Sequence, residues 1–138
     1  GEYDFLSNFY PCFVEFEGKL FPSVEHAFQA AKTLDAKIRK GFAVCPSPAY
    51  ARSLGREINL RPDWEDVKID IMTQLVKDKF TRNRARKDIR QLLLNTKDAI
   101  IEEGNNHGDT FWGVVNGEGR NELGKILMQV RDGIRERK

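Results

Sequence analysis

Cysteine and histidine are scarce in this chain, with two of each among its 138 residues. Cys12 and Cys45 have no metal-ligand spacing, and two cysteines are too few for the disulfide framework of a small secreted domain. We therefore expect two reduced thiols in a cytoplasmic protein. His26 and His107 cannot complete a ligand cluster with these cysteines, so we expect no metal and no other cofactor.

Long apolar runs and a strong charge of one sign are also missing. The longest apolar stretch is far shorter than the roughly 20 residues of a membrane-spanning helix, and we expect no signal peptide. The 23 basic and 21 acidic residues leave a net charge of +2, so the molecule as a whole is not a polyanion binder. We expect no membrane partner and a single globular domain over residues 1–138.

Hydrophobic periodicity predicts a mostly helical α+β domain with a small β-sheet. Alternation around Glu17-Gly18 predicts a short hairpin over 13–21, and residues 99–104 have the pattern of a further strand. Ser23 and Asp63 are the predicted N-caps of two helices. The expected helices cover 23–32, 35–42, 49–58, 61–80, 84–96 and the residues after 121.

The first predicted helix carries polar groups beside its apolar face. At 100° per residue, Glu25 and Lys32 lie about 20° apart and Gln29 lies near both. A carboxylate at the edge of a core is partly desolvated, which raises its pKa and suits it to proton transfer. The alternative is that Glu25 only favours the helix dipole and that these charges are solvated. The core face of this helix consists of Val24, Ala27, Phe28 and Ala31.

The predicted helix 61–80 places Lys68 and Lys79 in the angular range of its apolar residues. Such lysines either extend along the helix to water or point into a pocket and meet a phosphate. Trp64 either anchors the core or offers a stacking surface. The basic run at 82–90 is either a solvated helix face or a contact for nucleic acid.

Segment 105–121 is rich in glycine and asparagine and predicts a loop. The stretch GDTFWG places Asp109 three residues before Trp112, and NGEGRN leads directly into the last helix. A glycine-rich loop at a helix N-terminus offers free N–H groups to an anion. It matches neither a Walker loop nor a dinucleotide fingerprint, and the alternative is a turn followed by Asn121 as N-cap.

In their order along the chain, these motifs resemble the NADAR family. The resemblance spans residues 5–131 and rests on FLSNF, SVEHAFQAAK, DWEDVK, LLLNT, GDTFWG and GEGRNELGKI. It implies a YbiA-like (NADAR) α+β fold and an N-glycosidase. The implied reaction is removal of ADP-ribose from guanine in DNA or RNA. The alternatives are cleavage of the ribosylaminopyrimidine phosphates of riboflavin biosynthesis to ribose 5-phosphate, ADP-ribose binding without catalysis, and a helical interaction protein with no small ligand.

The resemblance ties Glu25, Trp64 and Asp109 to activity and implies that Asn8, Lys32 and Trp112 belong to the site. Glu25 or Asp109 is expected to supply the acid–base function. Lys32 is expected either to bind charge or to attack C1′ of an opened ribose and form a Schiff base. Ala27 stands where many members carry an aromatic residue, so a wider pocket is expected. The residues expected to bind substrate are Asn8, Phe9, His26, Gln29, Trp64, Lys68, Trp112, Gly113, Gly119 and Asn121.

Overall fold

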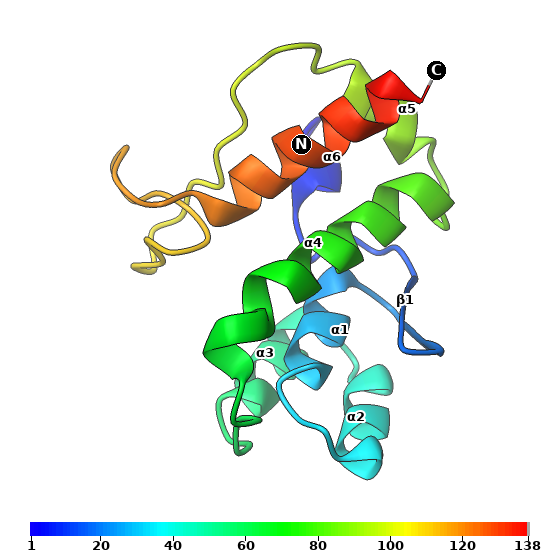
Figure 1. Cartoon of the computed structure of the whole chain (residues 1–138), viewed down its shortest axis with the longest axis vertical. Helices are drawn as coiled ribbons and strands as arrows, with labels where there is room; N and C mark the ends of the chain where they lie inside the picture. Colours follow the sequence, from blue (N-terminus) through cyan, green and yellow to red (C-terminus); the bar gives the residue numbers. More distant parts are fainter. Residues whose placement is uncertain (138) are drawn as a thin grey trace.

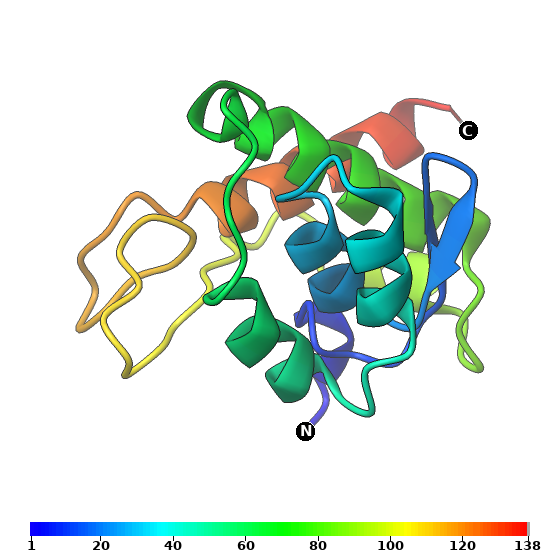
Figure 2. The ribbon, with the colours of Figure 1, turned by 90° about the horizontal axis from the view of Figure 1, so that it is seen from below.

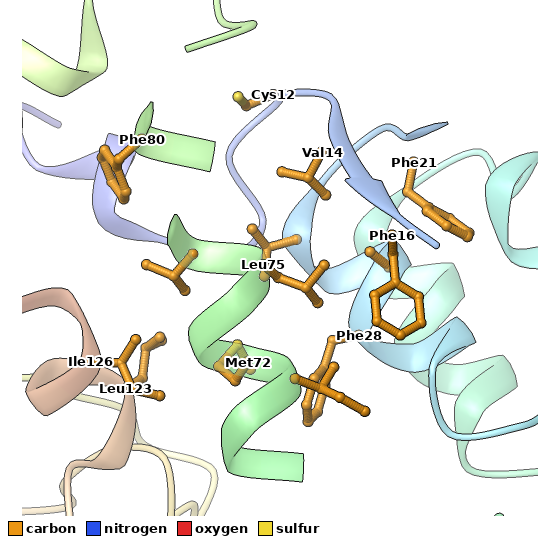
Figure 3. Packing of buried hydrophobic residues seen from close by; sticks show 14 of the residues in the cluster. Cys12, Val14, Phe16, Phe21, Phe28, Met72, Leu75, Phe80, Leu123 and Ile126 are labelled. Carbon is orange, nitrogen blue, oxygen red and sulfur yellow. The ribbon is translucent and has the colours of Figure 1, made fainter. Parts of the chain in front are cut away.

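Helix α4 (Trp64–Arg82) is the central element of the fold, which a computed structural model describes for residues 1–137. Helix α6 (Glu122–Glu136) packs along one side of α4 and helix α1 (Val24–Ala30) along the other (Figure 1). Figure 3 shows Met72 and Leu75 of α4 between apolar side chains of both neighbours. The predicted helices at these three positions are confirmed.

A hairpin of two short strands, β1 (Val14–Phe16) and β2 (Lys19–Phe21), covers one end of this core. The strands are antiparallel, and the two turn residues Glu17 and Gly18 have φ values of 48° and 83°. Two positive φ angles are typical of the type I′ turn that suits the twist of a two-residue hairpin. The expected hairpin is therefore confirmed, and its inward side chains are Val14, Phe16 and Phe21 (Figure 3).

Helices α2 (Ala36–Ala43) and α3 (Pro48–Gly55) pack on α1 (Figure 2). Ser23 caps α1 as predicted, because its Oγ accepts a hydrogen bond from the His26 N–H at 3.2 Å. Every residue of α1 is buried, including its polar ones. This helix is therefore a wall of the interior rather than an amphipathic surface helix.

The predicted helix 84–96 is wrong in length, because only α5 (Ile89–Leu94) forms. Asn83 ends α4 in the left-handed conformation with φ of 49°, and its side chain accepts from the Arg90 N–H at 3.1 Å. Its Nδ2 donates to the Lys87 carbonyl at 3.2 Å. These bonds close a turn over most of the basic run, which is therefore not a helix face.

The predicted strand at 99–104 is also wrong. The segment is extended, but its single ladder contact within the described chain is an isolated bridge between Gly104 and Val114. The Asn121 side chain occupies the position of a strand neighbour, since it donates to the Ile101 carbonyl and accepts from the Glu103 N–H, both at 2.9 Å.

The expected loop at 105–121 is confirmed, and it lies at the end of the molecule opposite the hairpin (yellow to orange in Figure 2). The N-terminal segment contains a 3₁₀ turn, η1 (Asp4–Leu6), that buries Phe5. None of the helices within residues 1–137 combines the length and apolar character that crossing a membrane requires.

Candidate active site

A cavity of about 320 Å³ opens between α1, α3, the first half of α4 and the 103–112 segment. Its volume falls in the range of small-molecule sites. The helical stripe and the loop that the sequence singled out both reach it. The expected site residues that line it are Asn8, Glu25, Gln29, Lys32, Trp64, Lys68, Asp109 and Trp112.

Glu25 lies on the buried wall of this cavity and is only 5% exposed. Its Oε2 accepts a 2.7 Å hydrogen bond from Gln29 Nε2, one turn further along α1. Arg52 Nε on α3 lies 3.5 Å from the same oxygen. A buried carboxylate that a cation and an amide donor hold in place can stabilise positive charge nearby.

Lys32 follows the end of α1 and is half-buried at the cavity. Its backbone is held by the Arg61 N–H, which donates to the Lys32 carbonyl at 2.7 Å. Burial lowers the pKa of the Lys32 ammonium, Glu25 opposes this shift, and Arg56 and Arg52 are among the cations that reinforce it. The side chain forms no hydrogen bond or ion pair with any residue in 1–137.

Glu103, which the sequence reading missed, has the most unusual carboxyl group of the cavity. Burial raises the pKa of Glu103 to about 7, and the negative charges of Asp109 and Glu25 add to the shift. Its Oε2 is buried and has no hydrogen-bond partner within the described residues. Its backbone is clamped between Asn121 Oδ1 and the Val114 N–H, at 2.9 and 2.8 Å. A positioned carboxyl with a pKa near neutrality can donate or accept a proton at physiological pH.

Asp109 contributes a second carboxylate on the same side of the cavity, in different surroundings. Its Oδ1 accepts hydrogen bonds from the backbone N–H groups of Phe111 at 3.1 Å and Trp112 at 2.9 Å. Neighbouring carboxyl groups whose environments differ in this way are the usual arrangement of an acid and its charged partner. The two bonds also fix Trp112 against the cavity.

Aromatic rings form the apolar wall. Trp64 at the start of α4 is 5% exposed and lies 5.0 Å from the Phe28 ring, centroid to centroid. Phe28 in turn meets Trp112 edge to face at 5.3 Å. The Trp64 ring is buried, as expected of a core anchor. It also lines the cavity, and its role as a stacking surface stays a prediction. Such a wall can bind the face of a planar base.

Phe9 and His26 do not line the cavity. The Phe9 ring lies under the Arg52 guanidinium at 4.5 Å, so it supports a cavity residue from behind. The His26 ring is buried, with Nδ1 2.7 Å from Ser23 Oγ and Nε2 3.1 Å from the Cys45 carbonyl. Both ring nitrogens are occupied by the protein, so His26 is a core residue of α1.

The expectation that Ala27 widens the pocket is wrong. The Ala27 side chain is fully buried in the core and is not among the groups that line the cavity. An aromatic residue at this position would therefore press on the core and would not narrow the cavity directly.

The glycine-rich entry to α6 forms no anion site. The N–H groups of Asn121, Glu122 and Leu123 donate to the carbonyls of Gly113, Phe111 and Trp112 at 3.2, 3.1 and 2.9 Å, so they are already used. The Asn121 side chain makes no capping bond, because it braces the 101–103 backbone instead. Gly119 and Gly113 also lie outside the cavity lining.

Gly113 nevertheless matters for the site, because it gives Glu103 room. A Cβ at Gly113 would lie 2.7 Å from Glu103 Oε2 and would overlap with the Glu103 carbonyl oxygen. The expected substrate-binding residue is thus a packing partner of the unusual carboxyl group.

Lys68 and Lys79 of α4 lie in different surroundings. Lys68 lines the cavity, where its Nζ pairs with Glu65 at 2.7 Å and lies 4.1 Å from the Phe111 ring centroid. Lys79 follows neither alternative, because it is buried in the core, where its Nζ donates to the Ser7 carbonyl at 2.8 Å.

The basic run at 82–90 stays away from the cavity. Arg82 and Arg84 both pair with Asp78, at 4.0 and 2.8 Å, and neither lines the cavity. The run therefore contributes nothing to the site.

Further cavity residues were not predicted from the sequence. Arg52 and Arg56 lie four residues apart on α3, and this spacing on one helix face is the signal that could have identified them. His107 sits on the loop next to Asp109. No three His, Cys, Asp or Glu side chains in residues 1–137 are arranged to hold a metal ion. The residues of the lining that the sequence reading missed are Phe28, Arg52, Arg56, Met72, Glu103, His107 and Gly108.

Comparison with known proteins finds relatives that are named N-glycosidases. The chain is 37% identical over 134 residues to N-glycosidase YbiA of Escherichia coli, which covers 95% of this chain and 81% of that protein. It is 40% identical over 139 residues to N-glycosidase Npun_R5314 of Nostoc punctiforme, covering 96% and 86%. It is 39% identical to the riboflavin biosynthesis protein VVA0006 of Vibrio vulnificus, of which it spans only 36%.

The fold agrees with these relatives. The NMR structure of E. coli YbiA matches 99% of this chain and 83% of its own, with a TM-score of 0.84 at 34% identity. This match confirms the predicted α+β architecture. A profile of the NADAR domain matches residues 1–135, and the chain therefore belongs to the NADAR family.

Proposed function

We propose that this protein is an N-glycosidase that hydrolyses the bond between C1′ of a ribose and a nitrogen of a base. The observation that carries this proposal is the Glu103 carboxyl, with a pKa near 7, beside the aromatic wall of a polar cavity. The names of the relatives, N-glycosidases in E. coli and N. punctiforme, support the same reaction class.

The cavity provides both functions that the reaction needs. Cleavage requires a proton on the leaving base and stabilisation of the positive charge that develops at C1′. Glu103 in its protonated form donates to the base nitrogen. Glu25, held beside Arg52 and Gln29, faces the developing charge. Water then adds to C1′ and keeps one of its protons in the new hydroxyl group. The other proton is transferred to the Glu103 carboxylate, which restores the acid.

Asp109 has a supporting part in this scheme. It was expected to share the acid–base function with Glu25, but one of its oxygens is committed to two backbone N–H groups. Its charge favours the protonated form of Glu103, and its bonds hold Trp112. The base then lies against Trp112, Phe28 and Trp64.

The surroundings of the cavity favour a small phosphorylated nucleoside as substrate. The nucleic-acid substrate is implied by the family resemblance, and its one supporting feature in the sequence is the basic run at 82–90. Arg82 and Arg84 of that run pair with Asp78 away from the cavity. Relatives from V. vulnificus and Zea mays are named riboflavin biosynthesis proteins. We therefore place the ribosylaminopyrimidine phosphates of that pathway first and ADP-ribosyl guanine second.

Product analysis tests the proposal. The protein is incubated separately with a ribosylaminopyrimidine phosphate and with an oligonucleotide carrying ADP-ribose on guanine, and products are identified by mass spectrometry. Release of ribose 5-phosphate from the first, lost in Glu103→Gln, is the expected result. Release of ADP-ribose from the second alone would reverse the order of the two substrates. No product from either would contradict the enzyme and favour a binding module.

A further inference from the structure

The basic side chains that line the cavity differ in whether the protein already balances their charge. Arg52 lies 3.5 Å from the Glu25 carboxylate, and its guanidinium also covers the Phe9 ring. Lys68 pairs with Glu65 at 2.7 Å. These two cations have acidic partners, so neither requires a ligand.

Lys32 and Arg56 have no such partner. Both line the cavity, and across residues 1–137 neither side chain forms an ion pair or a hydrogen bond. Arg56 is exposed at the C-cap of α3, and Lys32 is half-buried just after α1. Burial lowers the pKa of the Lys32 ammonium, and repulsion by the positive charge of Arg56 lowers it further. A bound anion would relieve this repulsion.

The packing of α1 on α3 explains why both cations line the same cavity. Glu25 near the start of α1 lies beside Arg52, and Gln29 one turn later lies against Gly55. Arg56 follows Arg52 by four residues and so shares its face of α3. The next turn of this contact brings Arg56 towards the end of α1.

We infer that Arg56 and Lys32 form an anion subsite that binds the phosphate group of the substrate. This inference rests on the proposed function and makes its substrate class a phosphorylated ribosyl compound. The guanidinium offers paired, planar donors to phosphate oxygens, and the ammonium adds a compact charge deeper in the cavity. Of the two roles expected for Lys32, this assigns the binding of charge.

Calorimetric titration with ribose 5-phosphate and with ribose tests the subsite. Arg56→Gln should weaken the binding of ribose 5-phosphate about tenfold, because one charge-assisted contact is lost. Its affinity for ribose should not change. The matched control is Arg86→Gln, which removes the same charge from an exposed arginine outside the cavity. This control should leave both affinities unchanged.

Three results would overturn the subsite. In the first, Arg56→Gln and the wild type bind ribose 5-phosphate with equal affinity. In the second, the wild type binds ribose and ribose 5-phosphate equally well. In the third, the wild type does not bind ribose 5-phosphate at millimolar concentration. Failure of the proposed function is a separate result. A phosphate affinity that depends on Arg56, without hydrolysis of any N-glycoside, would keep the subsite and remove the enzyme.

Discussion

The Gln29 side chain donates a 2.7 Å hydrogen bond to the Glu25 carboxylate one turn earlier in α1, and both residues are 5% exposed. This bond depends on a glycine of the neighbouring helix. A Cβ at Gly55 would overlap with Gln29 Oε1 and lie 2.8 Å from its Cδ. The contact between α1 and α3 therefore determines where the buried carboxylate points.

Gly55→Ala should displace Gln29 and disturb Glu25. Because Gln29 is buried, we expect the overpacking to lower the free energy of unfolding by about 1–3 kcal/mol and to reduce turnover. Gly41→Ala is the matched control, since a Cβ there meets no atom within 4 Å. It should stabilise helix α2 by up to about 1 kcal/mol. Urea unfolding of both variants measures the difference, and equal stability would contradict the contact.

Glu103→Gln should stabilise the protein at alkaline pH. The folded-state pKa of Glu103, about 7, lies above that of an ordinary glutamate. The folded state therefore binds more protons than the unfolded state between these two values, and stability falls as pH rises through that window. The glutamine side chain of the variant does not titrate, so the variant does not lose stability in this window. The thermal unfolding midpoint of the variant should lie above that of the wild type at pH 8 and equal it at pH 4. An equal difference between the two proteins at both pH values would refute the raised pKa of Glu103.

Lys79 should make stability rise with pH in a higher window. Burial lowers the pKa of Lys79 to about 7, whereas an unfolded lysine has a pKa of about 10.4. Between these values the unfolded state binds more protons, so stability rises by up to about 1.4 kcal/mol per pH unit. Lys79→Met should lack this slope from pH 7 to 10. Lys77→Met, at an exposed neighbour in α4, should keep it.

Lys32→Arg should keep partial activity, since arginine preserves the charge that binds phosphate. Borohydride added during turnover should leave the mass of the wild-type protein unchanged, because no imine is formed. Complete loss of activity in Lys32→Arg, together with a covalent ribosyl adduct on the wild type, would instead assign Lys32 as the nucleophile.

Much of the fold follows from local pattern. The hairpin has explicit turn residues, α1 has Ser23 as its cap, and α4 and α6 have apolar periodicity. The predicted cap Asp63 and the alternative cap Asn121 make no side-chain capping bond. The strand expected at 99–104 failed because the Asn121 side chain, distant in sequence, takes the backbone bonds of Ile101 and Glu103. No local sequence pattern indicates that the side chain of a distant residue will form these hydrogen bonds.

The candidate site divides in the same way. Glu25, Gln29 and Lys32 could be found because one helix face carries them. Glu103 could not, because two adjacent glutamates in an extended segment give no reason to choose between them. His26 lies on the correct helix, but only the packed structure shows that the protein occupies both ring nitrogens.

The dependence of kcat/KM on pH tests the central claim most directly. With the ribosylaminopyrimidine phosphate as substrate, activity that needs a protonated Glu103 should fall as pH rises above about 7. Glu103→Gln should lose 10²- to 10⁴-fold in kcat and should no longer show this decline in its residual activity. A Glu103→Gln variant that keeps wild-type activity, or the same alkaline decline in both proteins, would contradict Glu103 as the general acid.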